Sequence, residues 1–425
     1  MKRYSEYKDS GVQWIGQIPS HWKHYRNKDI FVESKNVVGE EAYKYTLLSL
    51  TKQGVIVRDL TENKGKFPKE YNTYKKVEAK DMIFCLFDVD ETPRTVGLSP
   101  YKGMITGAYD IFKINRAIPE YLLYYYLSVD DIKALRPIYK GLRKVVPMPS
   151  FMSLPVFLPP IAEQQAIVDY LKVKISKIEQ YVTERERERE LIESLKSSEI
   201  ANVVTHGLNP NAPMKDSGIP WIGMIPEHWK TRKIKFLFKE RSQKGFPNEP
   251  ILCATQKYGV IPQNMYENRV VVVNKGLEGL KLVKKGDFVI SLRSFQGGIE
   301  YAHYQGIISA AYTVLIPSQD INSQYIKFLF KSAPFIGLLQ TCVTGIREGQ
   351  NINYDVLRKN QIMLPPLDEQ QAIVDYIETR LTKIDSYIAD LQAEIDYLKE
   401  FKQRLVSDVV TGQICVAEPQ KGDLR

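Results

Sequence analysis

The sequence contains an internal repeat, and this repeat limits the possible folds more than any other feature of the chain. Residues 8–23 read KDSGVQWIGQIPSHWK and residues 215–230 read KDSGIPWIGMIPEHWK, with 12 of 16 positions identical. A second pair follows at nearly the same offset, because residues 158–171 (LPPIAEQQAIVDYL) and 364–377 (LPPLDEQQAIVDYI) share 11 of 14 positions. Self-similarity at a fixed offset indicates that one structural unit occurs twice.

Weaker similarities lie between and beyond these two motifs. They pair residues 103–109 (GMITGAY) with 306–312 (GIISAAY), Gly141-Leu142-Arg143 with Gly345-Ile346-Arg347, and Val203-Val204-Thr205 with Val409-Val410-Thr411. Each copy therefore contains a short motif, a variable block and a strongly repeated tail. We predict four segments, in which globular domains alternate with helices: 1–160, 161–207, 208–366 and 367–425.

The repeated tail has the pattern of a long helix. Two prolines precede it in each copy, and Glu163 or Glu369 follows in the first turn, where the helix dipole favours an anion. Apolar residues then recur at alternating spacings of three and four, which indicates the seam of a coiled coil. The seam residues are Val168, Leu171, Ile175 and Ile178 in the first copy and Val374, Ile377, Leu381 and Ile384 in the second.

The first tail departs from this pattern in its second half. Arg185 and Arg189 stand at seam positions, which interrupts the predicted pairing before Leu191, Ile192 and Leu195 resume it. Neither seam could be buried alone, so we predict that the two helices pack on each other. A pseudo-two-fold relation between the copies would make this pairing antiparallel.

The variable blocks, residues 24–150 and 231–357, differ from the tails. Short apolar runs broken by Gly, Pro and Asn indicate a mixed or mainly β domain, with one helix each at Glu120–Ser128 and Gln324–Lys331. The predicted fold class is therefore α+β. It consists of two tandem mixed α/β domains, separated by two long antiparallel coiled-coil helices and related by a pseudo-two-fold internal repeat.

Positive charge is concentrated in the variable blocks. Residues 24–150 hold 21 Lys and Arg against 16 Asp and Glu (+5), and residues 231–357 hold 16 against 9 (+7). The tails are acidic, with 7 against 9 (−2) in residues 161–202 and 5 against 10 (−5) in residues 367–411. We therefore expect a polyanion to contact the blocks, and we expect the helices to contact protein partners or each other.

Side chains suited to DNA contacts occur in both blocks. Lys and Arg bind phosphates, and Arg and Gln also make paired hydrogen bonds to base edges. The candidates in the first block are Lys52, Lys75, Lys76, Arg94, Lys140, Arg143 and Lys144. Those in the second block are Gln256, Lys257, Arg293, Gln296, Arg347 and Gln350.

The sequence lacks the motifs of several enzyme classes. It contains no GxxxxGK[ST], GxGxxG, HExxH or Asn-Pro-Pro-aromatic motif. The repeated pairs His21-Trp22 and His228-Trp229 have no second ligand at metal-binding spacing, so we predict a packing role for them and no metal site. We expect a chain without catalytic activity or a cofactor of its own.

The composition indicates where such a chain works. No run of about 18 uncharged apolar residues occurs, and the N-terminus lacks the apolar core of a signal peptide. The four cysteines are far apart and suggest no disulfide framework. We expect a cytoplasmic protein without membrane contact.

The two repeated motifs and their coiled-coil continuations together resemble the specificity subunit of type I restriction-modification enzymes. The resemblance spans essentially the whole chain. It implies that residues 24–150 and 231–357 lie in target recognition domains, which read the 5′ and 3′ halves of a bipartite site in double-stranded DNA. It also implies that the helices are conserved spacers, which set the separation of the two half-sites.

The resemblance further implies a set of partners. Two methyltransferase subunits would dock on this subunit and methylate adenine with S-adenosylmethionine. Restriction and translocase subunits, which use ATP and Mg²⁺, would join for DNA cleavage.

Two other functions remain open from the residues alone. A coiled-coil scaffold with incidental basic domains would bind DNA weakly and without sequence preference. A nuclease or methylase with an unrecognised site would be active as the isolated chain. The bases that are read do not follow from the sequence, because loop geometry and DNA shape contribute to recognition.

Overall fold

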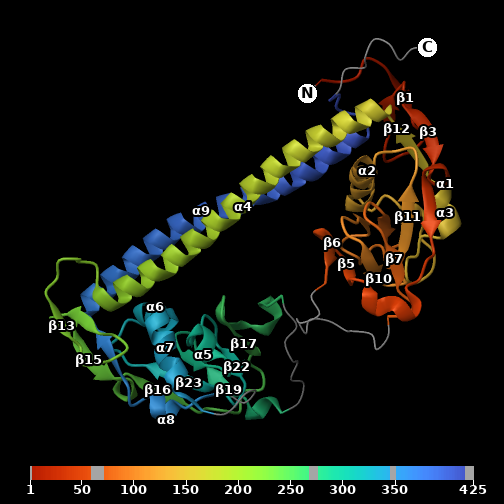
Figure 1. The fold of residues 1–425 in the computed structure, drawn as a ribbon. Coiled ribbons are helices and arrows are strands. Elements are labelled where there is room, and N and C mark those ends of the chain that lie inside the picture. The colour runs from red at the N-terminus through yellow and green to blue at the C-terminus, as the bar shows by residue number, and fades with distance from the viewer. Residues whose placement is uncertain (1, 59–70, 268–275, 345–350, 417–425) are drawn as a thin grey trace. The chain divides into compact units, whose positions relative to one another are not determined.

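The computed structural model describes residues 2–58, 71–267, 276–344 and 351–416, which belong to two compact units. Unit 1 comprises Met1–Arg185 and Ala393–Arg425, and unit 2 comprises Glu186–Gln392. Each unit contains one variable block together with parts of both long helices (Figure 1). The tandem mixed domains and the long helices of the predicted fold class are confirmed.

Unit 1 is built on a four-stranded antiparallel sheet with the order β4-β11-β8-β9. These strands are β4 (Phe31–Ser34), β8 (Met82–Phe84), β9 (Val96–Leu98) and β11 (Asp110–Ile114). Antiparallel pairs add β1 (Tyr7–Asp9) with β2 (Gln17–Pro19), β3 (Lys23–Arg26) with β12 (Pro155–Leu158), β5 (Leu48–Thr51) with β6 (Gly54–Val57), and β7 (Lys75–Val77) with β10 (Gly103–Ile105). The helices of the globular part are α1 (Asn27–Ile30), α2 (Pro119–Asp131) and α3 (Met148–Ser153).

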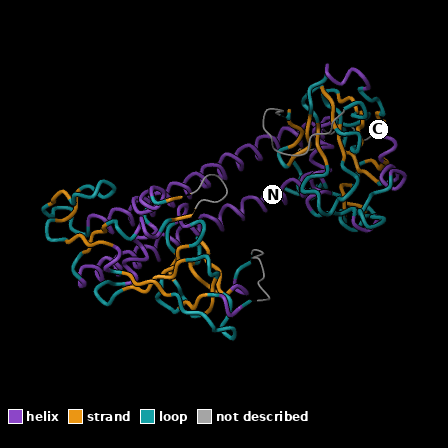
Figure 2. The backbone as a smooth tube through the Cα atoms, turned by 90° about the horizontal axis from the view of Figure 1, so that it is seen from below, coloured by secondary structure: helices purple, strands orange, loops and turns teal. Residues whose placement is uncertain are grey.

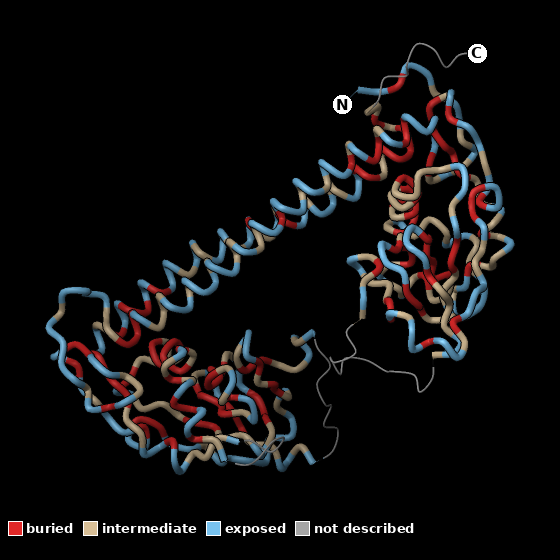
Figure 3. The backbone as a smooth tube through the Cα atoms, viewed as in Figure 1, coloured by how far each residue is buried: buried red, intermediate tan, exposed pale blue. Residues whose placement is uncertain are grey.

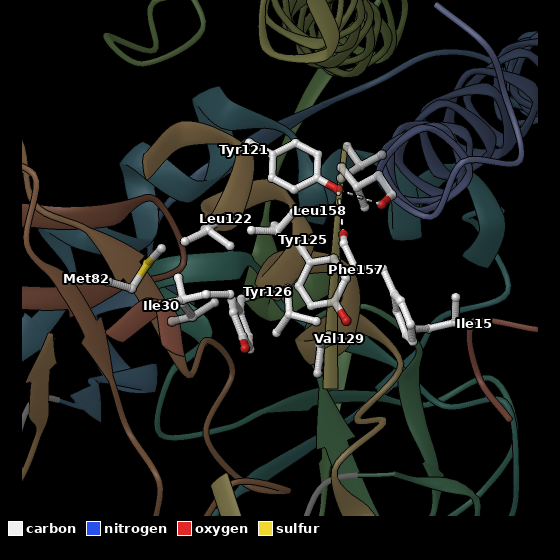
Figure 4. Close-up of a cluster of buried hydrophobic side chains, with 14 of the residues drawn as sticks. Ile15, Ile30, Met82, Tyr121, Leu122, Tyr125, Tyr126, Val129, Phe157 and Leu158 are labelled. Atoms are coloured by element: carbon white, nitrogen blue, oxygen red, sulfur yellow. Dashed lines mark hydrogen bonds between the residues drawn. The ribbon is translucent and has the colours of Figure 1, made fainter. Parts of the chain in front are cut away.

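Helix α2 supplies much of the unit 1 core. Its buried residues Tyr121, Leu122, Tyr125, Tyr126 and Val129 recur at helical spacing and pack against residues of the sheet, such as Met82 (Figure 4). Burial of so many aromatic side chains is a strong hydrophobic driving force for this domain. The structure thus confirms the helix that we predicted at Glu120–Ser128.

Unit 2 repeats this architecture. Its four-stranded sheet has the order β16-β23-β20-β21, formed by β16 (Phe238–Arg241), β20 (Phe288–Ile290), β21 (Glu300–Tyr301) and β23 (Thr313–Pro317). The pairs are β13 (Met214–Asp216) with β14 (Met224–Pro226), β15 (Lys230–Lys233) with β26 (Gln361–Leu364), β17 (Leu252–Thr255) with β18 (Gly259–Pro262), β19 (Lys281–Val283) with β22 (Gly306–Ile308), and β24 (Val343–Thr344) with β25 (Asn351–Ile352). The helices are α5 (Ser294–Gly297), α6 (Ser323–Lys331), α7 (Ala333–Thr341) and α8 (Tyr354–Leu357).

The two repeated tails form α4 (Ile161–His206) and α9 (Leu367–Val410), which lie side by side in Figures 1 and 2. In unit 1, Lys402 Nζ lies 3.1 Å from Glu179 Oε1. In unit 2, Arg380 Nε lies 3.0 Å from Glu199 Oε1. The residue numbers rise along one helix while they fall along the other, so the predicted antiparallel pairing is confirmed.

The C-terminal end of each long helix packs against the globular part of the other copy. In unit 1 the Tyr121 hydroxyl donates a hydrogen bond to the Val410 carbonyl at 3.2 Å (dashed in Figure 4). In unit 2 the Tyr325 hydroxyl donates to the Val204 carbonyl at 2.8 Å. The valine side chains of both Val-Val-Thr sequences are buried in the cores of the two units, which explains why the pair of valines is repeated at the ends of both tails.

The seam of α4 differs in part from the sequence prediction. Leu191 and Leu195 are exposed, and only Ile192 of that group is half-buried. Figure 3 shows that most of the middle of the two long helices is exposed or intermediate. The expectation that all three resume the seam was wrong. Arg185 and Arg189 do not break the helix, because each reaches a polar side chain of α9: Arg185 Nε lies 3.7 Å from Glu394 Oε2, and Arg189 donates to Gln392 Oε1.

Candidate nucleic-acid interface

In unit 1, the repeated motifs meet at a junction between the globular domain and helix α4. The Glu163 carboxylate, which is 8% exposed, accepts hydrogen bonds from the Tyr4 hydroxyl (2.6 Å) and from Trp22 Nε1 (3.0 Å). Its second oxygen lies 2.7 Å from His21 Nε2. Burial and the hydrogen bond to Glu163 raise the pKa of Tyr4 far above its usual value. The junction holds the start of the helix against the N-terminal motif.

Unit 2 has the equivalent junction around Glu369. Its carboxylate accepts a hydrogen bond from Trp229 Nε1 at 3.0 Å and lies 2.7 Å from His228 Nε2. Both His-Trp pairs therefore help to attach a domain to a helix. Sequence spacing did not reveal the shared acceptor, because His228 and Glu369 are 141 residues apart.

The glutamine that follows this glutamate completes the junction. Gln164 Oε1 accepts a hydrogen bond from the Ile118 amide, and its Nε2 donates to the Pro159 carbonyl, both at 2.9 Å. Gln370 repeats this arrangement with the Asn322 amide (2.8 Å) and a proline carbonyl (2.9 Å). Each glutamine ties the start of a long helix to the loop before α2 or α6.

Lys75 belongs to the internal framework of its domain. Its Nζ donates to the Tyr109 carbonyl (2.6 Å) and lies 3.3 Å from the Asp110 carboxylate, with the side chain 15% exposed. Lys281 makes the equivalent bond to the Tyr312 carbonyl in unit 2 at 2.8 Å. A lysine that recurs in both copies with the same backbone partner has a structural role.

Arg94 is also engaged inside its domain. Its guanidinium pairs with Asp131 at 2.9 Å and with Asp130 at 3.3 Å, and its side chain is 20% exposed. Asp130 in turn accepts hydrogen bonds from the amide and hydroxyl of Thr95. This network links the start of β9 to the end of α2.

The 140–145 loop (Lys140–Val145) carries three of the candidate cations. Lys140 is exposed, Arg143 is 68% exposed and pairs with Asp88 at 2.7 Å, and Lys144 pairs with Asp90 at 3.1 Å. Ion pairs at such exposure stabilise a fold only weakly, so these cations remain available to a phosphate.

Two further candidates lie elsewhere on unit 1. Lys52 is exposed in the turn between β5 and β6. Lys76 is half-buried, with Nζ 5.3 Å from the centroid of the Tyr45 ring. The structure therefore does not gather all seven candidates of the first block on one surface.

In unit 2, the turn between β17 and β18 lies against α5, and together they carry four candidates. Gln256, Lys257, Arg293 and Gln296 are all exposed. The Gln256 side chain packs directly on Gly297, where an added Cβ would lie 2.7 Å from Gln256 Cδ. Glycine at this position therefore permits close contact within the chain. Arg347 and Gln350 lie outside the described residues.

Lys331, which the sequence prediction missed, connects the two segments that carry these candidates. Its Nζ donates to the carbonyls of Gln256 (3.2 Å) and Gly297 (2.9 Å), and to Glu300 Oε1 at 2.6 Å. Glu300 is 2% exposed, and burial raises the pKa of its carboxyl group to about 7 despite the lowering effect of Lys331. No sequence motif marks this pair, because its members are 31 residues apart.

The eight seam residues lie on the packed side of the helices. Val168 and Leu171 are buried in the unit 1 core, and Val374 and Ile377 in the unit 2 core. The half-buried seam residues are Ile175, Ile178, Leu381 and Ile384.

Comparison with known proteins shows what the chain resembles. Residues 226–396 match the family model described as type I restriction modification DNA specificity domain. The matched segment lies in the second half of the chain, which is therefore similar to type I restriction-modification specificity subunits. This similarity supports the predicted role in DNA sequence specificity.

The individual relatives are distant in sequence. A putative type I restriction enzyme MjaX specificity subunit from Methanocaldococcus jannaschii is 22% identical, with 95% of this chain and 96% of the relative covered. The EcoKI specificity subunit of Escherichia coli is 17% identical, with 62% of this chain and 59% of the relative covered.

Solved structures support the fold. The chain resembles the HsdS subunit from Thermoanaerobacter tengcongensis with a TM-score of 0.50 and 17% identity, covering 93% of this chain and 98% of the other. A chain from a study of complex assembly and conformational transition of the type I R-M system gives a TM-score of 0.64 at 15% identity, covering 93% and 99%.

Two features are absent from the part of the chain that the structure describes. Among residues 2–58, 71–267, 276–344 and 351–416, no cluster of three or more His, Cys, Asp or Glu could hold a metal ion. Within the same residues, no helix combines the length and the apolar character needed to cross a membrane.

Proposed function

We propose that this chain is a specificity subunit that reads a bipartite site in double-stranded DNA, one half with each variable domain. Residues 1–160 form the first recognition domain and residues 208–366 form the second. The segments 161–207 and 367–425 are the spacer helices with the C-terminal tail. In this proposal the first domain reads the 5′ half-site and the second reads the 3′ half-site.

One observation carries this proposal: the framework repeats between the units, whereas the exposed loops do not. The junction glutamates Glu163 and Glu369 each contact the His-Trp pair of their own copy. The framework lysines Lys75 and Lys281 each donate to an equivalent tyrosine carbonyl. The turn that carries Lys52 in unit 1 corresponds to the turn that carries Gln256 and Lys257 in unit 2. A constant frame with different polar loops suits two readers of different base sequences.

We propose a smaller set of direct DNA contacts, chosen by side-chain exposure. We assign direct contacts to the exposed residues Lys52, Lys140, Arg143, Gln256, Lys257, Arg293 and Gln296. Lys76 and Lys144 are secondary candidates because both are half-buried. Arg347 and Gln350 remain candidates from sequence, and we assign Lys75 and Arg94 to the framework.

We further propose that two methyltransferase subunits dock on the acidic spacer helices and use S-adenosylmethionine to methylate adenine in the bound site. Restriction and translocase subunits that depend on ATP and Mg²⁺ would complete the assembly in the cytoplasm. The subunit described here would bind none of these cofactors itself. The net charges of −2 and −5 on the helix segments 161–202 and 367–411 suit a protein partner better than DNA.

Mapping the methylated sites of variants tests which domain reads which half. In cells that carry the partner methyltransferase, the double variant Gln256→Ala with Gln296→Ala should relax or change only the 3′ half of the methylated motif. Gln319→Ala, the same substitution at an exposed position of the second domain outside the proposed contacts, is the matched control and should leave both halves unchanged. A double variant whose methylated motif stays the same in both halves would refute this assignment.

A further inference from the structure

Leu142 at the tip of the 140–145 loop is the most exposed large hydrophobic residue among those that the structure describes. Its exposure relative to a free side chain is 102%, compared with 82% for Tyr43, the next most exposed. Removing the surface of a leucine side chain from water lowers the free energy. In the isolated subunit Leu142 stays in water, so this stabilisation is absent. Leu142 is therefore placed to contact something outside the chain.

Hydrogen bonds hold the loop backbone in this position. The amides of Lys140 and Val145 each donate to the carbonyl of the other at 2.9 Å, which forms a closed turn below the tip. Gly141 and Lys144 adopt left-handed backbone conformations, with φ of +69° and +43°. A left-handed lysine is uncommon, and such backbone conformations persist only where surrounding structure enforces them.

The neighbouring loop provides this support. The Asp88 amide donates to the Arg143 carbonyl at 2.7 Å, and the Val146 amide donates to the Leu86 carbonyl at 2.8 Å. The Arg143 guanidinium also lies over the Phe87 ring, 5.1 Å from its centroid. The tip of the loop is therefore ordered in advance of binding, which lowers the entropic cost of inserting an apolar side chain into a ligand.

The residues around Leu142 indicate the kind of ligand. Lys140, Arg143 and Lys144 flank it within the same loop, and Lys140 and Arg143 are exposed. An apolar tip between cations matches duplex DNA, in which stacked bases lie between two rows of phosphates. Proteins that bend DNA insert Leu, Ile, Phe or Met between base pairs in this manner.

We propose that Leu142 is a wedge that inserts between two adjacent base pairs of the half-site read by unit 1, while the flanking cations hold the phosphates on either side. The corresponding sequence of the second copy, Gly345-Ile346-Arg347, also has a large apolar residue between Gly and Arg, although it lies outside the described residues. This inference rests on the proposed reading of DNA by unit 1. It adds a distortion of the duplex at a defined step.

The test uses the full-length subunit in complex with its methyltransferase, and duplexes of the methylated motif with 2-aminopurine placed at successive steps of the 5′ half. Wild type should increase the fluorescence at one step, because an unstacked 2-aminopurine is no longer quenched. Leu142→Ala should abolish that increase and weaken binding about tenfold, since one buried apolar contact is lost. The dependence of binding on salt should stay as in wild type, because no phosphate contact is removed.

Two control variants separate the possible outcomes. Lys140→Ala should keep the fluorescence increase at saturation and reduce the slope of log affinity against log salt by about one. Val32→Ala, which shortens an exposed aliphatic side chain on β4 of the same domain, should behave as wild type.

Three results would contradict either the wedge or the proposed reading of DNA by unit 1. Unchanged fluorescence and affinity in Leu142→Ala, with specific binding by wild type, would refute the wedge alone. Normal DNA binding by Leu142→Ala with loss of methyltransferase from the complex would assign Leu142 to a protein contact instead. No motif-specific binding by the wild-type complex would refute the proposed function itself.

Discussion

Glu163 contributes to the fold through three hydrogen-bond partners that come from the N-terminal segment. Tyr4, His21 and Trp22 all converge on its carboxylate, and Trp22 is 1% exposed. The sequence showed that the His-Trp and Glu-Gln-Gln motifs are each repeated, which predicted that both matter. It could not show that they contact each other, because the contact forms only when β2 and α4 are brought together.

The variant Glu163→Ala tests this junction. It leaves the buried Trp22 indole N–H without an acceptor, so we expect the free energy of unfolding of unit 1 to fall by about 3 kcal/mol. Urea denaturation followed by tryptophan fluorescence measures the change. Asp169→Ala removes an exposed acid of the same helix and should change the stability by less than about 0.5 kcal/mol. Equal effects of the two substitutions would contradict the role of Glu163.

Glu300 provides a pH-dependent test in unit 2. Burial raises the pKa of its carboxyl group from the ordinary 4.5 to about 7. A pKa that is higher in the folded chain than in the unfolded chain gives a stabilising contribution below about pH 4.5, and this contribution is lost as the pH rises through about 7. At pH 8 the ionised Glu300 carboxylate therefore lowers the free energy of unfolding of wild type, and at pH 5 this loss is largely absent.

The variant Glu300→Gln cannot ionise and should not show this penalty. The free energy of unfolding of the variant, minus that of wild type, should increase by about 2 kcal/mol from pH 5 to pH 8. Urea denaturation of the full-length chain at both pH values gives this difference. Glu278→Gln, the same substitution at an exposed position, sets the background. If the two variants show the same pH dependence, Glu300 does not titrate in this range.

The position of Glu300 was not predictable from the repeat. Glu300 pairs with Val289 in the sheet, whereas the equivalent pairing in unit 1 joins Gly97 to Ile83. A buried carboxylate therefore stands in one copy where the other copy has glycine. The lysine that compensates it comes from the end of α6, and no local pattern relates the two positions.

Helix α4 shows how far apolar periodicity predicts packing. The spacing of three and four correctly predicted a long helix and placed Leu171, which is 0% exposed, on its packed side. The same spacing wrongly included Leu191 and Leu195, which are 61% and 54% exposed. Periodicity identifies a face of a helix, but the partner that covers this face depends on the opposite helix.

Two identical substitutions in α4 separate these cases. Leu171→Ala should lower the free energy of unfolding by about 2–5 kcal/mol, because it opens a cavity in the unit 1 core. Leu191→Ala should change it by less than about 0.5 kcal/mol. Chemical denaturation of both variants measures the difference. A loss at Leu191 as large as that at Leu171 would mean that the second half of the seam is buried after all.

The order of the chain through the two units could not be deduced from the repeat. Each unit contains the beginning of one long helix and the end of the other, and Tyr121 and Tyr325 hold these ends through the carbonyls of Val410 and Val204. The sequence predicted that the helices pair antiparallel. It did not predict that each domain is closed by the tail of the other copy, since this requires knowledge of where each helix ends.

The proposed spacer function predicts a change in the DNA site when both helices are shortened. Removal of one heptad from each keeps the seam in register and shortens each helix by about 10 Å, or about three base pairs of DNA. We expect the methylated motif to keep both half-sites with a shorter gap. Sequencing of methylated DNA measures the gap, and a changed half-site with an unchanged gap would contradict the assigned roles of domains and helices.

The measurement that bears most directly on the proposed function is sequencing of N6-methyladenine in DNA from cells that express the partner methyltransferase, with and without this chain. We predict a bipartite motif that is methylated only when the chain is present. A soluble assembled complex with an active methyltransferase that produces no such motif would contradict the proposal that this chain selects the site.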